Sequence, residues 1–327
     1  MRVQLVAVTR YSHFDEADWA TSRLYSPSTM LYCSIDVSLS GNMLFMFSKL
    51  PNFFVIGAAK CGTSTICHIL GQHPDVFMSD PKEPHFFGRD DPVKTWDWYA
   101  HLFEGAGEAI AIGEGSTSYT HPDIIERVAR EIWEYGPTSR LIYMVRHPIR
   151  RLESDWRMRT YEGWAGGSIN EAVKTGGSLL SHGMYWRNLN FYRQLFADEQ
   201  ILIIFMEDLA SDPSSTLRRC FEHLGVSPEA LIENRSVVKN KSSEFRKDGR
   251  LNRILKDSSL RNLLARLVPP GVKQHLMALL TSKLDVTLNW DTEAKRIAVD
   301  SFREDAQKFL SFCDKSPAFW NLEDNKD

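Results

Sequence analysis

The 327-residue sequence contains few cysteines, no long apolar run and little net charge. Its five cysteines are scattered and form no C-x-x-C pair, which excludes a disulfide framework and favours a reducing compartment. No apolar stretch approaches the roughly 18 residues that a membrane-spanning helix needs. Charges interrupt residues 1–30, where a secretory signal would lie. We therefore expect a cytoplasmic enzyme without a membrane span.

The net charge of −3 conceals one strongly basic stretch. Residues 239–273 contain ten Lys or Arg against three Asp or Glu. Such a stretch suits phosphates, an anionic substrate or nucleic acid. No repeat, RNA-binding signature or zinc spacing accompanies it, so we expect no nucleic-acid partner. Lys241, Ser242 and Arg246 are expected to close over a bound nucleotide.

Hydrophobic residues make up 43% of the sequence and charged residues 25%, which is typical of a globular protein. Strand-like and helix-like segments alternate from Pro51 onward without a linker. This alternation predicts an α/β doubly wound sheet in a single domain, residues 51–327. Residues 1–50 show no clear period, and we interpret them as an N-terminal extension or an extra strand.

The sequence is organised around one segment, residues 51–74, which reads PNFFVIGAAKCGTSTICHILGQHP. The apolar run 52–56 predicts a strand that is buried on both faces. Small residues and one lysine fill positions 57–62, and apolar residues at helical spacing follow from Thr63. A strand, loop and helix in this order aim backbone N–H groups and the positive end of the helix at one point. The segment therefore predicts a phosphate site.

The order of residues in this loop differs from the nucleoside-triphosphate pattern. A Walker A loop reads G-x-x-x-x-G-K-[ST], whereas here the lysine precedes the second glycine. An ordinary strand-to-helix turn with a chance lysine is the alternative. The small residues around the lysine and the three hydroxyls after the loop favour the phosphate site. The residues expected to bind the phosphate are Lys60, Cys61, Gly62, Thr63, Ser64 and Thr65.

The clearest strand in the sequence, residues 140–146 (RLIYMVR), ends in an arginine. At the carboxyl edge of a parallel sheet, where ligands bind, Arg146 would face a second phosphate. Ser154 lies about two turns into the helix that follows. A Walker B strand ends in an aspartate that holds magnesium. The arginine therefore argues against a metal-dependent nucleoside-triphosphate enzyme, and we expect no metal.

A loop over residues 78–88 (MSDPKEPHFFG) carries the candidate catalytic groups. Prolines on both sides of Glu83 exclude a helix, and Phe86 and Phe87 are expected to anchor the loop to the core. Glu83 has the carboxylate that a proton-abstracting base needs. His85 either orients Glu83, touches the acceptor or packs under the loop. From the sequence alone, two solvated loop residues are an equally good interpretation.

Two further segments bear on the site. A strand is expected at 109–113, and Glu114, Ser116 and Ser118 after it are candidates to line the site. Ser118 or Thr120 could instead cap the next helix. We favour Thr120 as that cap. The glycine-rich segment 158–183 is expected to form a mobile rim over the acceptor site. Neighbouring aromatic residues suit either a carbohydrate or lipid-glycan acceptor or ordinary packing: Trp156, Tyr161, Trp164, Tyr185 and Trp186.

With these motifs in this order, residues 51–320 resemble sulfotransferases that use 3′-phosphoadenosine 5′-phosphosulfate (PAPS). The segment FVIGAAKCGTST is similar to the family's 5′-phosphosulfate loop, and YMVRHPIRRLESDW is similar to its 3′-phosphate motif. The segment KEPHFF resembles the branch that contains heparan sulfate N- and O-sulfotransferases and bacterial relatives. The resemblance implies a P-loop-NTPase-like three-layer α/β sandwich with a central, mainly parallel sheet, and PAPS as co-substrate.

The resemblance also implies a role for each matching residue. Lys60 would contact the bridging oxygen and the 5′-phosphate, and residues 62–65 would donate hydrogen bonds to the same group. Arg146 and Ser154 would hold the 3′-phosphate. Glu83 would deprotonate a hydroxyl or amine of a small-molecule or glycan acceptor.

Two departures weaken heparan sulfate as the acceptor. The heparan sulfate enzymes have a lysine where this sequence has Gly115, and their disulfide-bearing C-terminal loop is absent here. Two other functions stay open. A P-loop small-molecule or nucleotide kinase would need Mg²⁺ and ATP, and a non-catalytic nucleotide-binding protein would have no need of Glu83.

Overall fold

The computed structural model describes residues 50–162, 164, 167–229 and 288–323. The N-terminal extension and the basic stretch 239–273 lie outside the described residues, and so do Lys241, Ser242 and Arg246. The domain boundary near residue 50 stays a prediction. Within the described ranges, no helix combines the length and the apolar composition that crossing a bilayer requires.

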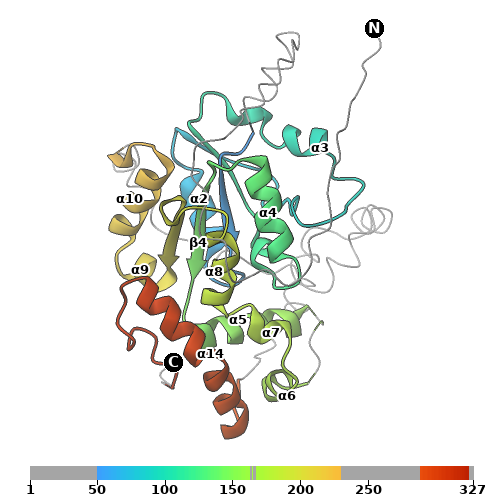
Figure 1. Ribbon diagram of the computed structural model, residues 1–327, viewed down its shortest axis with the longest axis vertical. Coiled ribbons are helices and arrows are strands. Elements are labelled where there is room, and N and C mark those ends of the chain that lie inside the picture. The colour runs from blue at the N-terminus through green and yellow to red at the C-terminus, as the bar shows by residue number, and fades with distance from the viewer. Residues whose placement is uncertain (1–49, 163, 165–166, 230–287, 324–327) are drawn as a thin grey trace, which may run out of the picture. The chain divides into compact units, whose positions relative to one another are not determined.

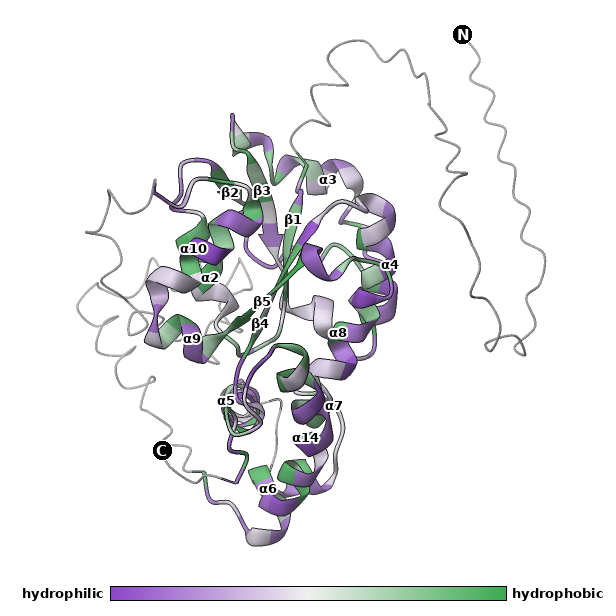
Figure 2. Ribbon diagram, turned by 60° about the vertical axis from the view of Figure 1, so that its left-hand side comes forward, coloured by the Kyte–Doolittle hydropathy of each residue, from purple (hydrophilic) through white to green (hydrophobic). Residues whose placement is uncertain are grey.

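The core contains a five-stranded sheet with the order β2-β3-β1-β4-β5, in which every neighbouring pair is parallel. The strands are β1 (Phe53–Gly57), β2 (Val76–Met78), β3 (Ala111–Gly115), β4 (Arg140–Val145) and β5 (Ile201–Phe205). All five residues of β1 are buried, as the apolar run predicted, and Figure 2 shows the central strands as hydrophobic. Since β3 and β4 flank β1, the carboxyl ends of these three strands meet at one edge.

Helices cover both faces of this sheet (Figure 1). They are α2 (Thr63–Leu70), α3 (Trp96–His101), α4 (Ile125–Tyr135), α5 (Pro148–Tyr161), α6 (Ile169–Lys174), α7 (Ser178–Ser181), α8 (Tyr185–Arg193), α9 (Met206–Ser211), α10 (Pro213–Leu224) and α14 (Thr292–Phe312). Helices α2, α9 and α10 lie on one side of the sheet, and α4 and α8 lie on the other. The predicted three-layer α/β sandwich with a parallel sheet is therefore confirmed.

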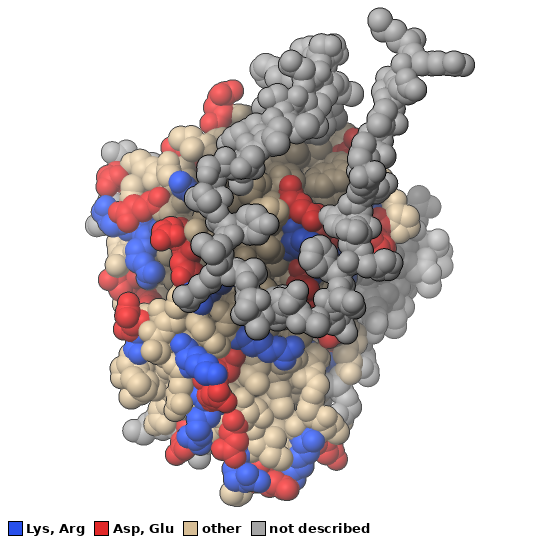
Figure 3. Space-filling model, in the orientation of Figure 1, with Lys and Arg blue, Asp and Glu red and all other residues tan. Residues whose placement is uncertain are grey.

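The C-terminal helix α14 completes the core. Phe302 and Phe309 are fully buried. Trp320 stacks on Phe309 with ring centroids 5.9 Å apart and an interplanar angle of 6°. The outer face of α14 carries pairs of opposite charge four residues apart, as in Arg296 with Asp300. In Figure 3, acidic and basic side chains are likewise interspersed over the described surface.

Two predictions around β3 were wrong in detail. The strand lies two residues later than expected, because Glu114 and Gly115 continue its pairing with β1. Thr120 does not cap α4, since a 3₁₀ turn (η2, Thr117–Thr120) intervenes and Ile124 takes the N-cap position. The Thr120 hydroxyl contacts the carbonyl of Thr117 at 3.5 Å instead.

The glycine-rich segment 158–183 is mostly helical where the structure describes it, and its role as a mobile rim over the acceptor site stays a prediction. Helix α5 continues to Tyr161. Ser168 and Glu171 form a capping box that starts α6, and Val173 on the inner face of that helix is buried. Local capping and burial therefore outweigh the glycine content.

Two of the aromatic residues considered as sugar platforms belong to the core. Trp156 is 4% exposed and Tyr185 is completely buried. Trp164, by contrast, is 64% exposed. Packing accounts for the first two, and only an exposed ring such as that of Trp164 is available to a sugar.

Candidate active site

The β1–α2 loop, residues 58–62, has the geometry of an anion-binding turn. Gly62 is the N-cap of α2, with a left-handed φ of 87°, and no side chain caps the helix. The first N–H groups of a helix have no intrahelical acceptor, and the positive end of the helix dipole lies beside them. Ser64 and Thr65 are exposed in the first turn, so their hydroxyls add further donors. This arrangement suits a phosphate group.

Two residues of the predicted phosphate-binding set point elsewhere. Cys61 is fully buried, and its Sγ lies 3.4 Å from the hydroxyl of Tyr185. Its backbone N–H donates to the carbonyl of Ala58, and burial raises the pKa of its thiol to about 11. Thr63 is also buried, with 4% of its surface exposed. The structure thus places the Cys61 side chain in the core, and leaves Thr63 to contribute through its backbone.

Lys60 and Arg146 come together at the carboxyl edge of the sheet. Lys60 is half-buried, and its Nζ lies 3.2 Å from the sulfur of Met158 on α5. Burial lowers the pKa of Lys60, although the nearby Asp155 carboxylate raises it. Arg146 leaves the end of β4, and its Nη1 lies 3.5 Å from the Lys60 carbonyl. Ser154 is partly exposed two turns into α5.

A buried network of charged residues, which the sequence-based reasoning missed, lies beside Lys60. Asp155 Oδ2 is 3.1 Å from Arg151 Nη1 and 3.2 Å from Arg159 Nη2. Burial by itself raises the pKa of Asp155, but the neighbouring His182 and the two arginines hold it well below its ordinary value. Arg151 also donates to the carbonyl of Leu179, which ties α5 to α7. The charge spacing Arg151, Asp155, Arg159 was the available signal.

The KEPHFF loop, residues 82–87, attaches to the neighbouring strand. The Glu83 N–H donates to the Gly115 carbonyl at the end of β3, at 3.2 Å. Glu83 Oε1 lies 2.5 Å from Lys82 Nζ, and Oε2 accepts a hydrogen bond from the hydroxyl of Thr117 at 3.2 Å. Neither Lys82 nor Thr117 was predicted, although Lys82 adjoins Glu83 in sequence. The site therefore spans the ends of β3, β1 and β4.

His85 supports the Glu83 carboxylate from its other side. His85 Nε2 lies 3.2 Å from Glu83 Oε2, and Nδ1 lies 2.7 Å from Ser118 Oγ. Because a carboxylate can only accept, Nε2 donates to Glu83, while Nδ1 and the Ser118 hydroxyl form the second hydrogen bond of the ring. Burial raises the pKa of Glu83, but His85 and the Lys82 ammonium outweigh it and lower the value to about 2.

Backbone strain concentrates at these residues. Among the described residues, four that are not glycine have a positive φ: Lys60, Glu83, His85 and Asp314. Three of the four are the residues predicted to do the chemistry. Left-handed backbone at such residues persists only where the surroundings impose it, and it clusters at functional sites.

Glu114, which the sequence offered as a candidate to line the site, lies in the core instead. The side chain has no exposed surface and accepts hydrogen bonds from three hydroxyls. It lies behind the KEPHFF loop, because β3 extends through position 114 and turns this side chain inward. Ser118, in contrast, does reach the site through His85.

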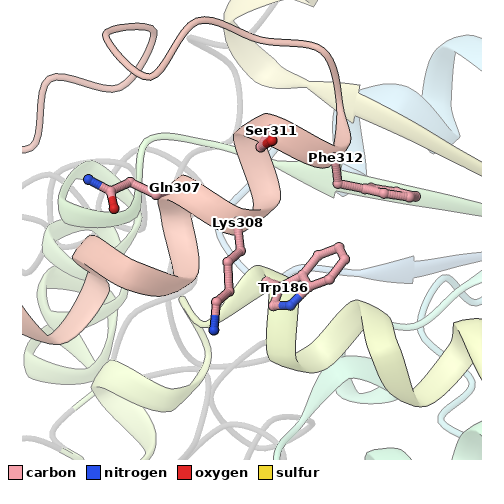
Figure 4. A pocket seen from close by; sticks show the side chains of 5 residues that line it. All are labelled: Trp186, Gln307, Lys308, Ser311 and Phe312. Atoms are coloured by element: carbon pink, nitrogen blue, oxygen red, sulfur yellow. The ribbon is translucent and has the colours of Figure 1, made fainter.

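One surface hollow of the described structure lies away from these residues. It has a volume of about 500 Å³ and lies between α8 and α14 (Figure 4). Its lining consists of Trp186, Gln307, Lys308, Ser311 and Phe312. None of the predicted site residues contributes to it. In the part of the chain that the structure describes, no group of three or more His, Cys, Asp or Glu residues is arranged to hold a metal ion.

Comparison with known proteins agrees with this geometry. Residues 50–290 match the sulfotransferase domain family, so the chain belongs to the sulfotransferase family. This membership decides against the kinase that the sequence had left open.

Individual relatives are distant. Heparan sulfate glucosamine 3-O-sulfotransferase 3A1 of Mus musculus is 28% identical over 210 residues, covering 60% of this chain and 51% of the relative. Carbohydrate sulfotransferase 15 of Mus musculus is 23% identical over 273 residues, covering 62% and 48%. The chain thus spans about half the length of the curated relatives it matches. A sulfotransferase structure from Alicyclobacillus acidocaldarius shares the fold, with a TM-score of 0.58, 22% identity and coverage of 83% of this chain and 98% of that chain.

The buried network yields a stability prediction. Asp155→Asn leaves Arg151 fully buried without its counter-charge, and breaking such a pair costs about 3–5 kcal/mol. The folded pKa of Asp155 is lowered, so its contribution is present above the unfolded pKa of about 3.9. This contribution is lost as the pH falls from the unfolded pKa towards the lower pKa of the folded protein. Urea unfolding at neutral and acidic pH should show a less stable variant with a flatter acid dependence.

The matched control is Asp300→Asn. Asp300 pairs with Arg296 at the same i, i+4 spacing, but its side chain is 49% exposed. Exposed pairs contribute little to stability. Equal losses of unfolding free energy in the two variants would show that burial does not increase the contribution of the Asp155 pair to stability.

Proposed function

We propose that this chain transfers a sulfuryl group from PAPS to a hydroxyl or amine of an acceptor, with a carbohydrate or glycolipid as the acceptor class. One observation carries the proposal. Three neighbouring parallel strands deliver a lysine, an arginine and a hydrogen-bonded carboxylate to one edge: Lys60 after β1, Arg146 after β4 and Glu83 on the Gly115 carbonyl of β3. Membership of the sulfotransferase family supports the same chemistry.

The residues at this edge fit a doubly phosphorylated nucleotide. The uncapped N-terminus of α2, the exposed hydroxyls of Ser64 and Thr65, and Lys60 suit its 5′ end. Arg146, with Ser154 further along α5, suits its 3′-phosphate. When bound, PAPS supplies the sulfuryl group and the leaving phosphate. The half-buried ammonium of Lys60 then stabilises the negative charge that develops on that phosphate.

Glu83 takes the proton of the acceptor. As the acceptor oxygen or nitrogen bonds to sulfur and the sulfur–oxygen bond to the phosphate breaks, the acceptor proton moves to the Glu83 carboxylate. Positioned general bases contribute roughly 10²–10⁴ in rate. Glu83 begins as a weak base, because Lys82 lies 2.5 Å from its Oε1. We propose that Lys82 moves from Glu83 to an anionic group of the acceptor, such as a carboxylate or sulfate on a glycan, while His85 and Thr117 retain Oε2.

Radiolabelled PAPS tests the function directly. The protein is incubated with sulfated and neutral glycans, a glycolipid and a phenol, each with and without EDTA. Label is expected in an anionic glycan, with or without the chelator. Binding of the desulfated product, 3′-phosphoadenosine 5′-phosphate (PAP), without transfer to any acceptor would support a non-catalytic nucleotide-binding protein instead.

Glu83→Gln is expected to keep PAP binding and to lose transfer. The amide fills the same space but cannot accept the acceptor proton, so turnover should fall by roughly 10²–10⁴. Calorimetry with PAP and the transfer assay measure the two properties separately. The exposed Glu126→Gln serves as the control substitution, and full turnover in Glu83→Gln would remove Glu83 from its role.

Lys60→Ala is expected to reduce both PAP affinity and turnover. A hydrogen bond to a charged group contributes about 1.5–3 kcal/mol, which corresponds to a loss of affinity of about 10- to 100-fold. Calorimetry and the transfer assay measure both effects, with the surface variant Lys308→Ala as the control. Normal affinity together with a normal rate would contradict the assignment of the β1–α2 loop.

Lys82→Met is expected to shift the acid limb of the pH–rate profile to higher pH. Removing the ammonium raises the pKa of Glu83 from about 2 towards its ordinary value. Because the base must be deprotonated to work, activity then begins to fall at a higher pH. The measurement is kcat/KM for an anionic glycan across the acidic range, and KM for that glycan should also rise. An unchanged acid limb with an unchanged KM would exclude the role of Lys82.

A further inference from the structure

A carboxylate lies in the core directly behind the KEPHFF loop. Glu114, the fourth residue of β3, has no exposed surface. Its Oε1 accepts hydrogen bonds from the hydroxyls of Tyr99 at 2.8 Å and Tyr119 at 2.5 Å, and its Oε2 accepts one from Ser116 at 2.7 Å. Burial raises the pKa of Glu114, and the three hydroxyl donors act in the opposite direction. A polar group in such a position is costly unless its hydrogen bonds are satisfied.

Two of these hydroxyls also hold the backbone of the loop. The Ser116 Oγ accepts a hydrogen bond from the His85 N–H at 3.0 Å. The Tyr119 hydroxyl accepts from the Phe86 N–H at 3.2 Å and from the Phe87 N–H at 3.3 Å. Three successive backbone donors of the loop therefore end on oxygens that are themselves bound to Glu114.

Tyr99, whose hydroxyl is the third donor to Glu114, contacts the loop in a different way. Tyr99 contacts the loop through its ring, which stacks on Phe86 with centroids 4.1 Å apart and an interplanar angle of 9°. The Tyr99 hydroxyl donates to Glu114, as the Tyr119 hydroxyl does, while the loop N–H bonds belong to Tyr119 and Ser116. The chain thus contains two tyrosines with the same partner but different relations to the loop.

The number of protons on a hydroxyl explains why the buried group is a carboxylate. A hydroxyl has one proton to donate, and its oxygen can accept. Glu114 takes the protons of Ser116 and Tyr119, which leaves both oxygens facing the loop as acceptors. A glutamine at position 114 has an NH₂ group in place of one carboxylate oxygen. The hydroxyl opposite that group would have to accept from it and turn its own proton towards a loop N–H.

The loop that this network holds carries the strained backbone of the site. Glu83 has a φ of 62° and His85 a φ of 50°. The adjoining turn η2 supplies the remaining contacts, from Thr117 to Glu83 and from Ser118 to His85. Fixing the backbone at residues 85–87 therefore fixes where the Glu83 carboxylate points.

We propose that Glu114 is a positioning residue for sulfuryl transfer: it sets the direction of the Ser116 and Tyr119 hydrogen bonds and so holds Glu83 and His85 in their reactive placement. This inference rests on the proposed role of Glu83 as the base. Glu114 itself stays in the core and touches neither substrate.

The test compares Glu114→Gln, Tyr119→Phe and Tyr99→Phe. The first two are expected to lower kcat by about 10- to 100-fold, because a displacement of about 1 Å at a reacting group has effects of this size. Their affinity for PAP should stay near that of the unmodified protein. Tyr99→Phe loses a hydrogen bond to the same carboxylate but keeps its ring stack on Phe86, so it should lose stability with little loss of kcat. Equal kcat losses in the two tyrosine variants, or a normal kcat in Glu114→Gln, would reduce the network to a structural role.

A second measurement does not depend on activity. Amide hydrogen exchange at residues 85–87 should become faster in Glu114→Gln and Tyr119→Phe but not in Tyr99→Phe. Unchanged exchange in the first two would overturn the inference even if transfer were demonstrated. Faster exchange in a protein that transfers no sulfuryl group would instead place the failure in the proposed function. Should Glu114→Gln not fold, Ser116→Ala removes the acceptor of the His85 N–H together with one of the three donors to Glu114, and should show the same loss of kcat.

Discussion

The register of three parallel strands determines where every group of the site lies. Phe53 of β1 lies opposite Gly113 of β3 and Arg140 of β4, so the three strands reach their carboxyl ends side by side. Position 113 tolerates only a hydrogen in place of a side chain, because a Cβ there would lie 2.3 Å from the Phe53 ring. The close packing of these strands brings the Gly115 carbonyl and Arg146 to the edge where the β1–α2 loop begins.

Most of the fold could be predicted because it depends on local patterns. The apolar runs of β1 and β4 each predict a strand without reference to the rest of the chain, and the structure has these strands at Phe53–Gly57 and Arg140–Val145. β3 was misplaced by two residues, since Glu114 and Gly115 are poor strand formers and only their pairing with β1 extends the strand. Pairing with β1, and not the intrinsic strand propensity of these two residues, therefore determines where β3 ends.

The site residues also fall into those that local sequence patterns predict and those that depend on the fold. Lys60, Glu83 and Arg146 stand next to glycines, prolines or a strand end, and such positions are visible in the sequence. Lys82 adjoins Glu83 and Asp155 lies four residues from Arg151, so both pairs are visible in the sequence, but the burial of the second pair and the orientation of the first depend on the fold. The sequence also does not show burial, so it could not reveal that the side chains of Cys61 and Glu114 lie in the core.

The two reactive side chains differ in what holds them before any ligand arrives. Within the described part of the chain, the Lys60 ammonium contacts the Met158 thioether, a weak acceptor, and forms no ion pair. The Glu83 carboxylate is already committed to Lys82. Under the proposed function, a nucleotide would therefore meet a lysine without an ion pair among the described residues, whereas an acceptor would meet a base that must first release Lys82. This asymmetry would favour an ordered encounter, in which the sulfuryl donor is seated first and the second reactant releases the base only on arrival, so that little bound donor would be lost to water.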